Sequence, residues 1–314
     1  MKTVMVTGAS GMIGLALTET LLEKGFKVIG TDSKPNDFVN SPNYSFVQAS
    51  IDDKSSITNI LNGSSIDALV HLACSCDNDF PPIITSAEEK KSAAVDKYLY
   101  KAAVDAGVGD IILLSTYQVY APQKTREPIR ETSDEKPTTA YGKMKYESEK
   151  AMAKVVTKSP SCKCVIARVS PVYTKDFTDN LKAKVYDPKE GCAFVYGYGD
   201  YGYSFCCVYN LVDFIVGVLN IAPGVNYMGV YNVCDTKPIA AKEILDVLRE
   251  CHAIGAVVQR NLGSEGIKGL FNFGGGGKND YRYNDISLAC SNISYDNTKA
   301  QRISAFRWKL SNTK

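Results

Sequence analysis

Residues 7–14 read T-G-A-S-G-M-I-G and decide the fold of this chain. They follow the apolar run 4–6 and precede another apolar stretch, so three glycines lie between a short strand and the start of a helix. In this arrangement Gly8 makes a tight turn, Gly11 lets the backbone approach a bound anion, and Gly14 lets the helix pack against the strand. Free N–H groups at the helix N-terminus attract the anion. The alternative is a purely structural turn, because Gly-rich turns are common.

The next segment completes the unit that such a turn requires. Gly25 ends the helix, a second strand is expected at residues 26–31, and Asp32 closes it. A carboxylate roughly twenty residues beyond the glycines is placed to bond the adenosine ribose of a dinucleotide. It accepts from the ribose hydroxyls and repels a 2′-phosphate, so Asp32 favours NAD over NADP, although Lys34 weakens that discrimination. The alternative is that Asp32 only starts a turn before Pro35.

The rest of the chain alternates short apolar runs with helical stretches, the pattern of an α/β fold with a doubly wound, Rossmann-like parallel sheet. Strands are expected at residues 46–48, 68–73, 111–115 and 165–169, and helices at 86–106 and 140–156 on the two faces of the sheet. From about Pro171 the alternation gives way to Gly- and Tyr-rich sequence. We therefore predict an NAD-binding domain over 1–170, to which segments near 205–220 and 229–250 return, and a smaller C-terminal lobe over 171–314 that mainly binds substrate.

Composition argues against several classes of protein. The 314 residues carry a net charge of +2 without a block of Lys or Arg, so no nucleic-acid partner is expected. The first residues do not resemble a signal peptide and no apolar run could cross a bilayer, which predicts a cytoplasmic protein without a membrane partner. The ten cysteines form no C-x-x-C pair and are expected to be reduced apolar fillers. With only His71 and His252 available, no metal is expected, and His71 is expected to be hydrogen-bonded at a strand end.

The candidate catalytic residues lie in the middle of the chain. Tyr141 and Lys145 are four residues apart, a spacing that places both side chains on one face of the expected helix. A free tyrosine has a pKa of about 10, too high for a base at neutral pH, but a nearby ammonium favours the ionised phenol. Thr116 follows a central strand, at the edge where α/β proteins bind ligands, and its hydroxyl can hold a substrate oxygen. Chance spacing on an exposed helix is the alternative for the Tyr-Lys pair.

Together these motifs resemble those of the extended short-chain dehydrogenase/reductases, the NAD-dependent epimerase/dehydratase family, along nearly the whole chain. The matching segments are T-G-A-S-G-M-I-G at 7–14, Asp32, H-L-A at 71–73, S-T-Y-Q-V-Y at 115–120, Y-G-K-M-K at 141–145, R-V-S-P-V-Y at 168–173, V-Y-N-L at 208–211, Y-N-V at 231–233 and the stretch 296–308. The resemblance implies that Thr116, Tyr141 and Lys145 are catalytic.

The resemblance also implies contacts for the NAD cofactor. Those to the pyrophosphate fall on Gly8, Ser10, Gly11, Met12, Ile13 and Gly14, those to the adenosine on Asp32, Ser33, Ser50 and Ile51, and those to the nicotinamide side on Leu72, Ala73, Tyr141 and Lys145. A homodimer is implied as well, in which helices 86–106 and 140–156 pair and partly bury Tyr98, Leu99 and Met152.

Several positions depart from the pattern of the resembled family. Ser50 replaces its usual Asp, Cys74 its frequent Ala, Pro171 its frequent Asn, Asn210 its usual Asp, and Tyr203-Ser204 an Arg-Asp pair that Lys278 or Arg282 would replace. These changes concern substrate and adenine contacts and leave the three catalytic residues in place. The glycine run 274–277 is expected to be a flexible loop, because it lacks the strand and the Ser/Thr of a P-loop.

Members of the resembled family share hydride transfer at a sugar carbon and differ in the later steps of the reaction. Its dehydratases and decarboxylases generally carry acidic groups directly after the catalytic Ser/Thr, where this chain has Tyr117 and Gln118. We therefore expect a sugar or nucleotide-sugar substrate and favour a 4-epimerase. The alternatives are an NAD-dependent sugar or uronate dehydrogenase or ketone reductase, then a dehydratase, and finally a non-catalytic NAD-sensing protein. The tyrosine-rich loop 196–203 either stacks on the substrate or packs the small lobe.

Overall fold

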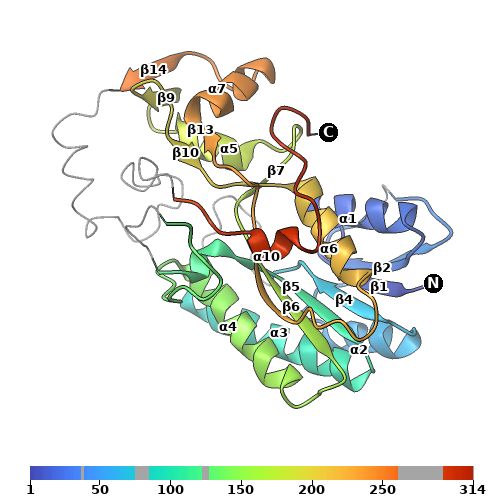
Figure 1. Ribbon diagram of the computed structural model, residues 1–314. Coiled ribbons are helices and arrows are strands. Elements are labelled where there is room, and N and C mark those ends of the chain that lie inside the picture. The colour runs from blue at the N-terminus through green and yellow to red at the C-terminus, as the bar shows by residue number, and fades with distance from the viewer. Residues whose placement is uncertain (37–38, 75–84, 122–126, 261–292, 314) are drawn as a thin grey trace. The chain divides into compact units, whose positions relative to one another are not determined.

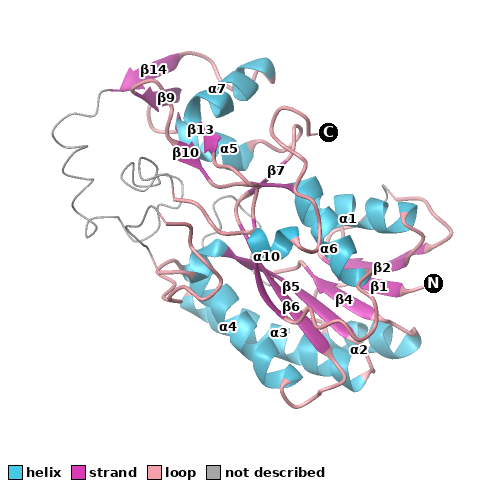
Figure 2. Ribbon diagram, in the orientation of Figure 1, coloured by secondary structure: helices cyan, strands magenta, loops and turns pink. Residues whose placement is uncertain are grey.

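The computed structural model of the chain (Figures 1 and 2) describes residues 1–36, 39–74, 85–121, 127–260 and 293–313. It divides the chain into two compact units. The first comprises 1–121, 135–169 and 212–231, and the second 122–134, 170–211 and 232–314. Of the segments that we expected in the first unit, residues 122–134, 205–211 and 232–250 belong instead to the second. The glycine run 274–277, Lys278 and Arg282 lie outside the described residues.

The first unit is built on one sheet of seven strands in the order β12-β6-β5-β4-β1-β2-β3. The strands are β1 (Thr3–Thr7), β2 (Lys27–Asp32), β3 (Tyr44–Gln48), β4 (Ala68–His71), β5 (Asp110–Thr116), β6 (Lys163–Val169) and β12 (Gly229–Val233). All neighbouring pairs from β3 to β6 are parallel, which confirms the predicted Rossmann-like sheet. One expected strand is shorter than predicted: β4 ends at His71, so Leu72 and Ala73 lie beyond it.

The register of these strands gathers the ends of β1, β4, β5 and β6 at one edge of the sheet. Thr7 at the end of β1 pairs with His71 at the end of β4. Thr116 at the end of β5 pairs with Val169 at the end of β6. Because carboxyl ends of parallel strands share one edge, residues from four chain segments meet there.

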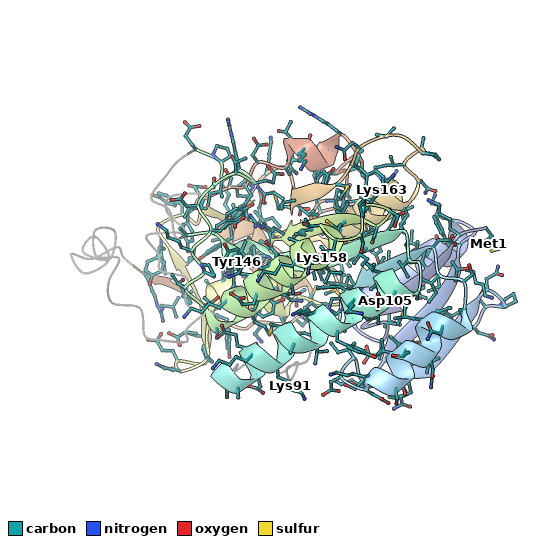
Figure 3. The ribbon with its side chains drawn as sticks, turned by 90° about the horizontal axis from the view of Figure 1, so that it is seen from below. Met1, Lys91, Asp105, Tyr146, Lys158 and Lys163 are labelled. Atoms are coloured by element: carbon teal, nitrogen blue, oxygen red, sulfur yellow. The ribbon has the colours of Figure 1, made fainter. Side chains whose placement is uncertain are left out.

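Helices cover both faces of this sheet. The helices are α1 (Met12–Glu23), α2 (Lys54–Gly63), α3 (Ser86–Asp105), α4 (Ala140–Val156) and α6 (Val208–Leu219), with a short 3₁₀ turn, η1 (Tyr117–Val119), after β5. α3 and α4 pack side by side on one face, as Figure 3 shows from below, and α1 lies on the other. The predicted bounds of α4, residues 140–156, are confirmed. The helix begins there because Thr139 caps its first turn by accepting the N–H of Gly142.

The packing of α3 and α4 buries two of the residues that we expected at a dimer surface. Leu99 and Met152 are fully buried in the hydrophobic core of a single chain, not at an outer face. Tyr98 bonds the hydroxyl of Thr58 at 2.5 Å and the carbonyl of Lys54 at 3.2 Å. These residues make their contacts within one chain, with the sheet and with α2. They therefore give no evidence for a homodimer, which stays a prediction.

The second unit is a small α/β lobe. Its strands are β7 (Val172–Tyr173), β8 (Tyr186–Asp187), β9 (Cys192–Tyr196), β10 (Gly202–Tyr203), β11 (Cys206–Cys207), β13 (Ile239–Ala240) and β14 (Val257–Arg260), and its helices are α5 (Asp179–Val185), α7 (Ala241–Glu250) and α10 (Thr298–Gln301). Aromatic rings run in contact from Tyr196 through Tyr201 and Tyr203 to Phe205. The tyrosine-rich loop therefore packs this lobe, apart from Tyr198, which is 87% exposed.

The second unit also explains why Asn210 stands where the resembled family has Asp. The amide of Asn210 donates to the half-buried carboxylate of Asp235 at 2.7 Å and to the carbonyl of Trp308 at 2.8 Å. Its oxygen accepts the N–H of Trp308 at 3.0 Å. An aspartate could not donate to Asp235, and burial already raises the pKa of that carboxyl. An amide is therefore the side chain that ties the C-terminal segment to α6.

Two glycines in helices of the first unit offer a direct test of the packing. A Cβ at Gly14 would lie 2.1 Å from the carbonyl oxygen of Gly8, whereas a Cβ at Gly63 meets nothing within 4 Å. We expect Gly14→Ala to lower the free energy of unfolding by about 1–3 kcal/mol, the usual cost of overpacking. Gly63→Ala should raise it by up to about 1 kcal/mol. Urea unfolding of both variants measures this, and equal midpoints would contradict the packing of α1 on β1.

Candidate active site

The glycine turn at the end of β1 is shaped by the surrounding backbone. Gly8 has a φ of +75° and its N–H donates to the carbonyl of Thr31 at 2.9 Å. A Cβ there would lie 2.9 Å from the amide nitrogen of Ala73, and one at Gly14 would overlap the turn itself. The expected turn at Gly8 and the close helix packing at Gly14 are therefore present. A Cβ at Gly11 would come no nearer than 3.5 Å to the protein, so internal packing does not require this glycine.

The space beside Gly11 fits the anionic part of a dinucleotide. Gly11 is the N-cap of α1 and has no side chain with which to cap it, and Met12 and Ile13 form the first turn. The N-terminal N–H groups of this helix therefore have no capping side chain and are suited to bind an anion. These features agree with the expected pyrophosphate contacts, which stay a prediction.

Asp32 at the end of β2 supports the same turn. One of its carboxylate oxygens accepts the N–H of Ser10 and the other accepts the N–H of Lys34, each at 3.0 Å. The Ser10 hydroxyl donates to the carbonyl of Lys34 at 3.0 Å, and the exposed Ser33 offers its carbonyl to Gln48. Each carboxylate oxygen of Asp32 retains a lone pair for a further donor, so a ribose can still bind.

Sequence reasoning missed two residues that hold the turn in place. The amide of Asn36 donates to the carbonyl of Ala9 at 3.2 Å and to the Tyr44 hydroxyl at 3.0 Å. A Cβ at Gly30 would lie 2.5 Å from that hydroxyl, so a larger residue there would displace Tyr44. Burial and the charge of Asp32 raise the pKa of Tyr44 to about 12. Asn36 and Tyr44 come from segments with no motif, so no pattern in the sequence marks them.

The other expected cofactor residues lie at the same edge of the sheet. Leu72 and Ala73 continue from β4, and their N–H groups donate to the carbonyl and the hydroxyl of Thr7, at 3.2 and 3.4 Å. Ile51 is buried beyond β3. The exposed Ser50 donates its hydroxyl to Asp52 at 2.6 Å. The structure thus brings these residues to the carboxyl ends of the strands, and their contacts with a cofactor stay predictions.

The three candidate catalytic residues also lie at this edge. Lys145 is buried within α4, one turn beyond the half-buried Tyr141, and its ammonium lies 6.0 Å from the centre of the Tyr141 ring. Thr116 ends β5 and is buried, and its oxygen accepts the N–H of Gln118 at 3.3 Å. A hydroxyl that accepts in this way still has a proton to donate. The group therefore combines a hydroxyl, a phenol and a buried cation.

A tight junction joins η1, which directly follows Thr116, to the start of α4, the helix that carries Tyr141. The Thr139 hydroxyl donates to the side-chain oxygen of Gln118 at 2.6 Å while it accepts the N–H of Gly142 at 3.0 Å. A Cβ at Gly142 would lie 2.4 Å from the carbonyl oxygen of Gln118. The start of the helix therefore touches the backbone that follows Thr116, and only glycine fits at the contact.

A buried polar group that the sequence did not predict lies behind Lys145. As expected, His71 is hydrogen-bonded at a strand end: Nδ1 is 2.8 Å from the Thr7 hydroxyl and Nε2 is 3.1 Å from Oδ1 of Asp96 on α3. Asp96 also bonds Ser148, whose hydroxyl lies 2.7 Å from that of Tyr100. Only the position of His71 could be anticipated, because nothing local marks Asp96 as its partner.

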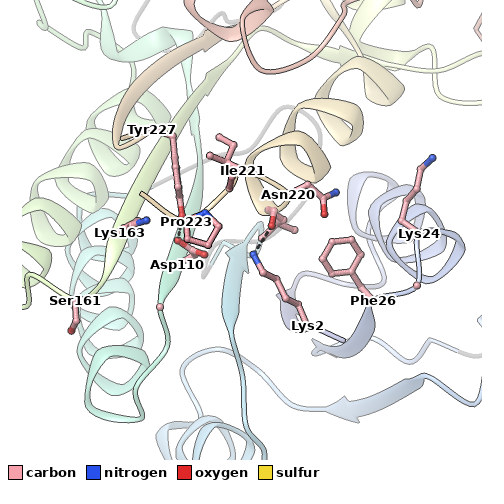
Figure 4. Close-up of a pocket in the computed structure, with 14 residues that line it drawn as sticks. Lys2, Lys24, Phe26, Asp110, Ser161, Lys163, Asn220, Ile221, Pro223 and Tyr227 are labelled. Carbon is pink, nitrogen blue, oxygen red and sulfur yellow. Dashed lines mark hydrogen bonds between the residues drawn. The ribbon is translucent and has the colours of Figure 1, made fainter. Parts of the chain in front are cut away.

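A cavity of about 600 Å³ lies at the opposite edge of the sheet, where β1, β5 and β6 begin (Figure 4). Lys2 donates to the carbonyl of Leu219 at 2.7 Å, and the Tyr227 hydroxyl bonds Asp110. The ammonium of Lys163 lies over the Tyr227 ring, 4.8 Å from its centre. Because these polar groups bond one another, the cavity is lined by a structural network and is not part of the candidate site.

The described part of the chain also shows its cysteines, its possible metal ligands and the length of its apolar helices. Eight cysteines lie there and all are free, four of them buried, which agrees with their role as apolar fillers. Within the described ranges, no cluster of three or more His, Cys, Asp or Glu side chains could hold a metal ion. Within the same ranges, no helix is both long and apolar enough to cross a membrane.

Comparison with known proteins gives a match at the level of the family. The sequence profile of the "NAD dependent epimerase/dehydratase family" matches residues 4–234. A curated relative, the UDP-glucuronate 4-epimerase of Thermodesulfobacterium geofontis (strain OPF15), is 28% identical over 137 residues, which make up 38% of this chain and 41% of that protein. The chain thus covers less than half the length of the curated relatives that it matches.

Solved structures match over almost the whole chain. The UDP-glucuronic acid 4-epimerase of Bacillus cereus, in complex with UDP-glucuronic acid and NAD, has a TM-score of 0.70 at 20% identity, covering 98% of this chain and 95% of that one. DesIV, a dTDP-glucose 4,6-dehydratase from Streptomyces venezuelae with NAD bound, also has a TM-score of 0.70 at 20% identity, covering 98% and 92%. At these identities the likeness shows a common fold.

The position of Asp32 predicts how a change there affects dinucleotide binding. Asp32→Asn keeps an acceptor for Ser10 but removes the charge, so NADP should bind more tightly than before. Asp32→Ala should weaken NAD binding roughly ten- to a hundredfold, which is the contribution of a hydrogen bond to a charged group. It should also reduce the difference in affinity between NAD and NADP. Calorimetric titration measures both.

The matched control for these variants is Asp67→Ala. That carboxylate also accepts a backbone N–H, from Thr3 at 2.7 Å, but at the opposite edge of the sheet, so its removal should leave NAD affinity unchanged. Tighter binding of NADP than NAD by the unaltered protein would overturn the role of Asp32.

Proposed function

Because the chain belongs to the NAD dependent epimerase/dehydratase family, we propose that it is a nucleotide-sugar 4-epimerase that uses Thr116, Tyr141 and Lys145. The observation that carries the proposal is the buried Lys145 ammonium beside the Tyr141 phenol, at the strand edge where Thr116 ends β5. A partly exposed phenol next to a buried cation has the chemistry of an acid/base group.

Each of the three residues has a distinct role in this proposal. The Thr116 hydroxyl holds the sugar oxygen at the reacting carbon and orients it toward Tyr141. As a phenolate, Tyr141 takes the proton of that hydroxyl, and it returns the proton when the ketone is reduced. Lys145 supplies the positive charge that favours the phenolate. The junction through Gln118 and Gly142 keeps the two hydroxyl-bearing residues at a fixed separation.

NAD is the cofactor of the family, and the residues of this chain fit it. When bound, it supplies the hydride acceptor and donor that both epimerisation and net oxidation need. On the protein's side, the uncapped N-terminus of α1 and the open space at Gly11 would hold the pyrophosphate, and Asp32 would bind the adenosine ribose.

The loop that follows Thr116 favours epimerisation over elimination. Elimination needs a group that removes a proton from carbon, and the residues after Thr116 are Tyr117 and Gln118. The Gln118 amide is already engaged by Thr139 at 2.6 Å, so it acts in the architecture of the site. Neither position offers a carboxyl group, and this supports a reaction that returns the hydride to the opposite face of the same carbon.

The family and the named relative support a class of substrate. A UDP-glucuronate 4-epimerase is 28% identical over part of the chain, which supports a UDP-linked sugar or uronate as the first candidate. The second candidate function is a dehydrogenase or reductase of a similar sugar. The same three residues serve it equally well, because it differs only in releasing the ketone or the alcohol.

A substrate screen separates the two functions. The protein, supplied with NAD, is incubated with UDP-, CDP- and TDP-linked sugars and with free aldoses and uronates, while NADH absorbance and the stereochemistry of the products are followed. An epimerase forms the C4 epimer without net NADH. Net accumulation of NADH with an oxidised sugar would instead identify a dehydrogenase and contradict the epimerase.

Substitution of the catalytic tyrosine tests the mechanism itself. Tyr141→Phe keeps the ring but removes the oxygen that carries the proton, so turnover should fall by roughly two to four orders of magnitude while NAD affinity changes little. The same helix offers a matched control in Tyr146, whose ring also has a lysine four residues on, Lys150, with its ammonium 4.5 Å from the ring centre.

The two tyrosine variants should differ in turnover. Tyr146→Phe should leave turnover within about a factor of two, because the pair Tyr146 and Lys150 is not at the strand edge. A Tyr141→Phe protein with the full rate on its substrate would disprove the acid/base role, and the family membership would stand. Steady-state rates and calorimetric titration with NAD measure both effects.

A further inference from the structure

The peptide group between Ala9 and Ser10, in the glycine turn, is held at both of its polar ends. Its carbonyl accepts a hydrogen bond from the side-chain amide of Asn36 at 3.2 Å. Its N–H donates to Oδ2 of Asp32 at 3.0 Å. The C=O and N–H of a trans peptide point in opposite directions, so Asn36 and Asp32 lie on opposite sides of this peptide. Together the two side chains fix its rotation.

The segment after β2 folds back so that Asn36 reaches the turn. The N–H of Lys34 donates to Oδ1 of Asp32, and the hydroxyl of Ser10 donates to the carbonyl of Lys34, each at 3.0 Å. Asn36 is only 6% exposed. A carbonyl accepts but cannot donate, so the NH₂ group of Asn36 must be the part that faces Ala9. Asn36 is therefore a buried donor fixed against the turn.

A second hydrogen bond supports Asn36 from the side of the sheet. Its amide also donates to the hydroxyl of Tyr44 on β3 at 3.0 Å. This hydroxyl and the methyl group of Ala9 both approach Gly30 on β2, where a Cβ would lie 2.5 Å from the first and 2.9 Å from the second. Burial and the charge of Asp32 raise the pKa of Tyr44 to about 12, so its hydroxyl remains a neutral acceptor. Two strands thus anchor Asn36.

Loss of the bond from Asn36 would disturb Asp32. If the peptide rotated, the Ala9 carbonyl would turn toward the Asp32 carboxylate and the Ser10 N–H would turn away from it. Two negative groups would then face each other, and Asp32 would lose a donor that orients it. Asp32 is the residue to which the proposed function gives the adenosine ribose.

We propose that Asn36 is a positioning residue for the dinucleotide, which locks the peptide between Ala9 and Ser10 and so holds the Asp32 carboxylate in the orientation that binds the ribose. The proposal rests on the role given to Asp32 in the proposed function. Asn36 acts through the turn and through Asp32, and needs no contact of its own with the cofactor.

The first experiment measures hydrogen exchange at the Ser10 amide by NMR, in the protein without cofactor. Asn36→Leu removes the donor and keeps a side chain of similar size. Asn36 bonds only the carbonyl end of the peptide, yet exchange at the N–H end should become about fivefold faster or more, because the peptide can then rotate. Unchanged exchange in a folded Asn36→Leu protein would overturn the proposal.

The second experiment separates positioning from stability by calorimetric titration with NAD. Asn36→Leu should raise the NAD dissociation constant about three- to tenfold. The matched control is Asn232→Leu. Asn232 is 1% exposed and its amide also donates to two acceptors, the carbonyls of Ile129 and Asp296 at 2.9 and 3.2 Å, but it lies on β12, the edge strand opposite β3.

The control variant should lose stability without losing affinity. The urea midpoint of Asn232→Leu should fall, while its NAD dissociation constant stays unchanged. An equal loss of NAD affinity in Asn232→Leu and Asn36→Leu would reduce Asn36 to a structural role and overturn the proposal.

A double-variant cycle tests the route through Asp32. In Asp32→Ala no carboxylate remains to be oriented, so adding Asn36→Leu should change the NAD dissociation constant by less than about twofold. Losses of binding free energy that add in full would overturn the route. If Asn36→Leu does not fold, Tyr44→Phe keeps the ring and removes the acceptor behind Asn36. It should change Ser10 exchange and NAD affinity in the same directions, and unchanged values would overturn the proposal.

Failure of this proposal and failure of the proposed function give different results. The exchange measurement needs neither cofactor nor substrate. A protein whose NAD affinity depends on Asn36 as expected, but which forms no C4 epimer, would keep the positioning role and reject the proposed function. A protein that forms the epimer, with Ser10 exchange and NAD affinity independent of Asn36, would do the reverse.

Discussion

The buried ion pair between Arg168 on β6 and Glu149 on α4 fixes the helix that carries Tyr141 and Lys145 to the sheet. Two guanidinium nitrogens donate to the Glu149 carboxylate, at 2.6 and 3.1 Å, and the Ser115 hydroxyl bonds it as well. Ser115 immediately precedes Thr116, and Glu149 lies one turn beyond Lys145. One interaction thus sets the position of α4 relative to the strand that ends in Thr116. Removing one partner of such a pair typically costs about 3–5 kcal/mol, so the site depends on it being intact.

Contacts at the start of α4 and near its middle complete the placement that the ion pair begins. At the start, Gly142 sits against the backbone of Gln118, and Thr139 bonds both residues. Near the middle, Ser148 joins the helix to α3 through Asp96 and Tyr100. A helix held at three points along its length can present Tyr141 and Lys145 in a fixed geometry, which acid/base catalysis requires.

The sequence predicts the fold and the local motifs well, because these depend on neighbouring residues. The spacing of Gly8 and Gly14 reflects packing within one βαβ unit, and the bounds of α4 follow from its cap at Thr139. Asp96, Asn36 and Gln118 were not predicted, since their partners come from distant segments. An apolar helix residue has the same pattern in a core and in an interface, so the sequence does not show that Leu99 and Met152 lie in the core of a single chain. The sequence of the tyrosine-rich loop is compatible with substrate stacking or with packing, and the structure shows its rings packed within the second unit.

The contact between η1 and α4 offers the sharpest measurement. Gly142→Ala inserts a methyl group 2.4 Å from the Gln118 carbonyl oxygen, which must move Tyr141 relative to Thr116 without touching the glycine turn. If the fixed separation of these residues produces catalysis, turnover falls about a hundredfold while the NAD dissociation constant is unchanged. The neighbouring exposed residue provides the comparison, since Lys143→Ala should change neither turnover nor the NAD dissociation constant. Full turnover in a folded Gly142→Ala protein would contradict the view that this junction positions the catalytic groups.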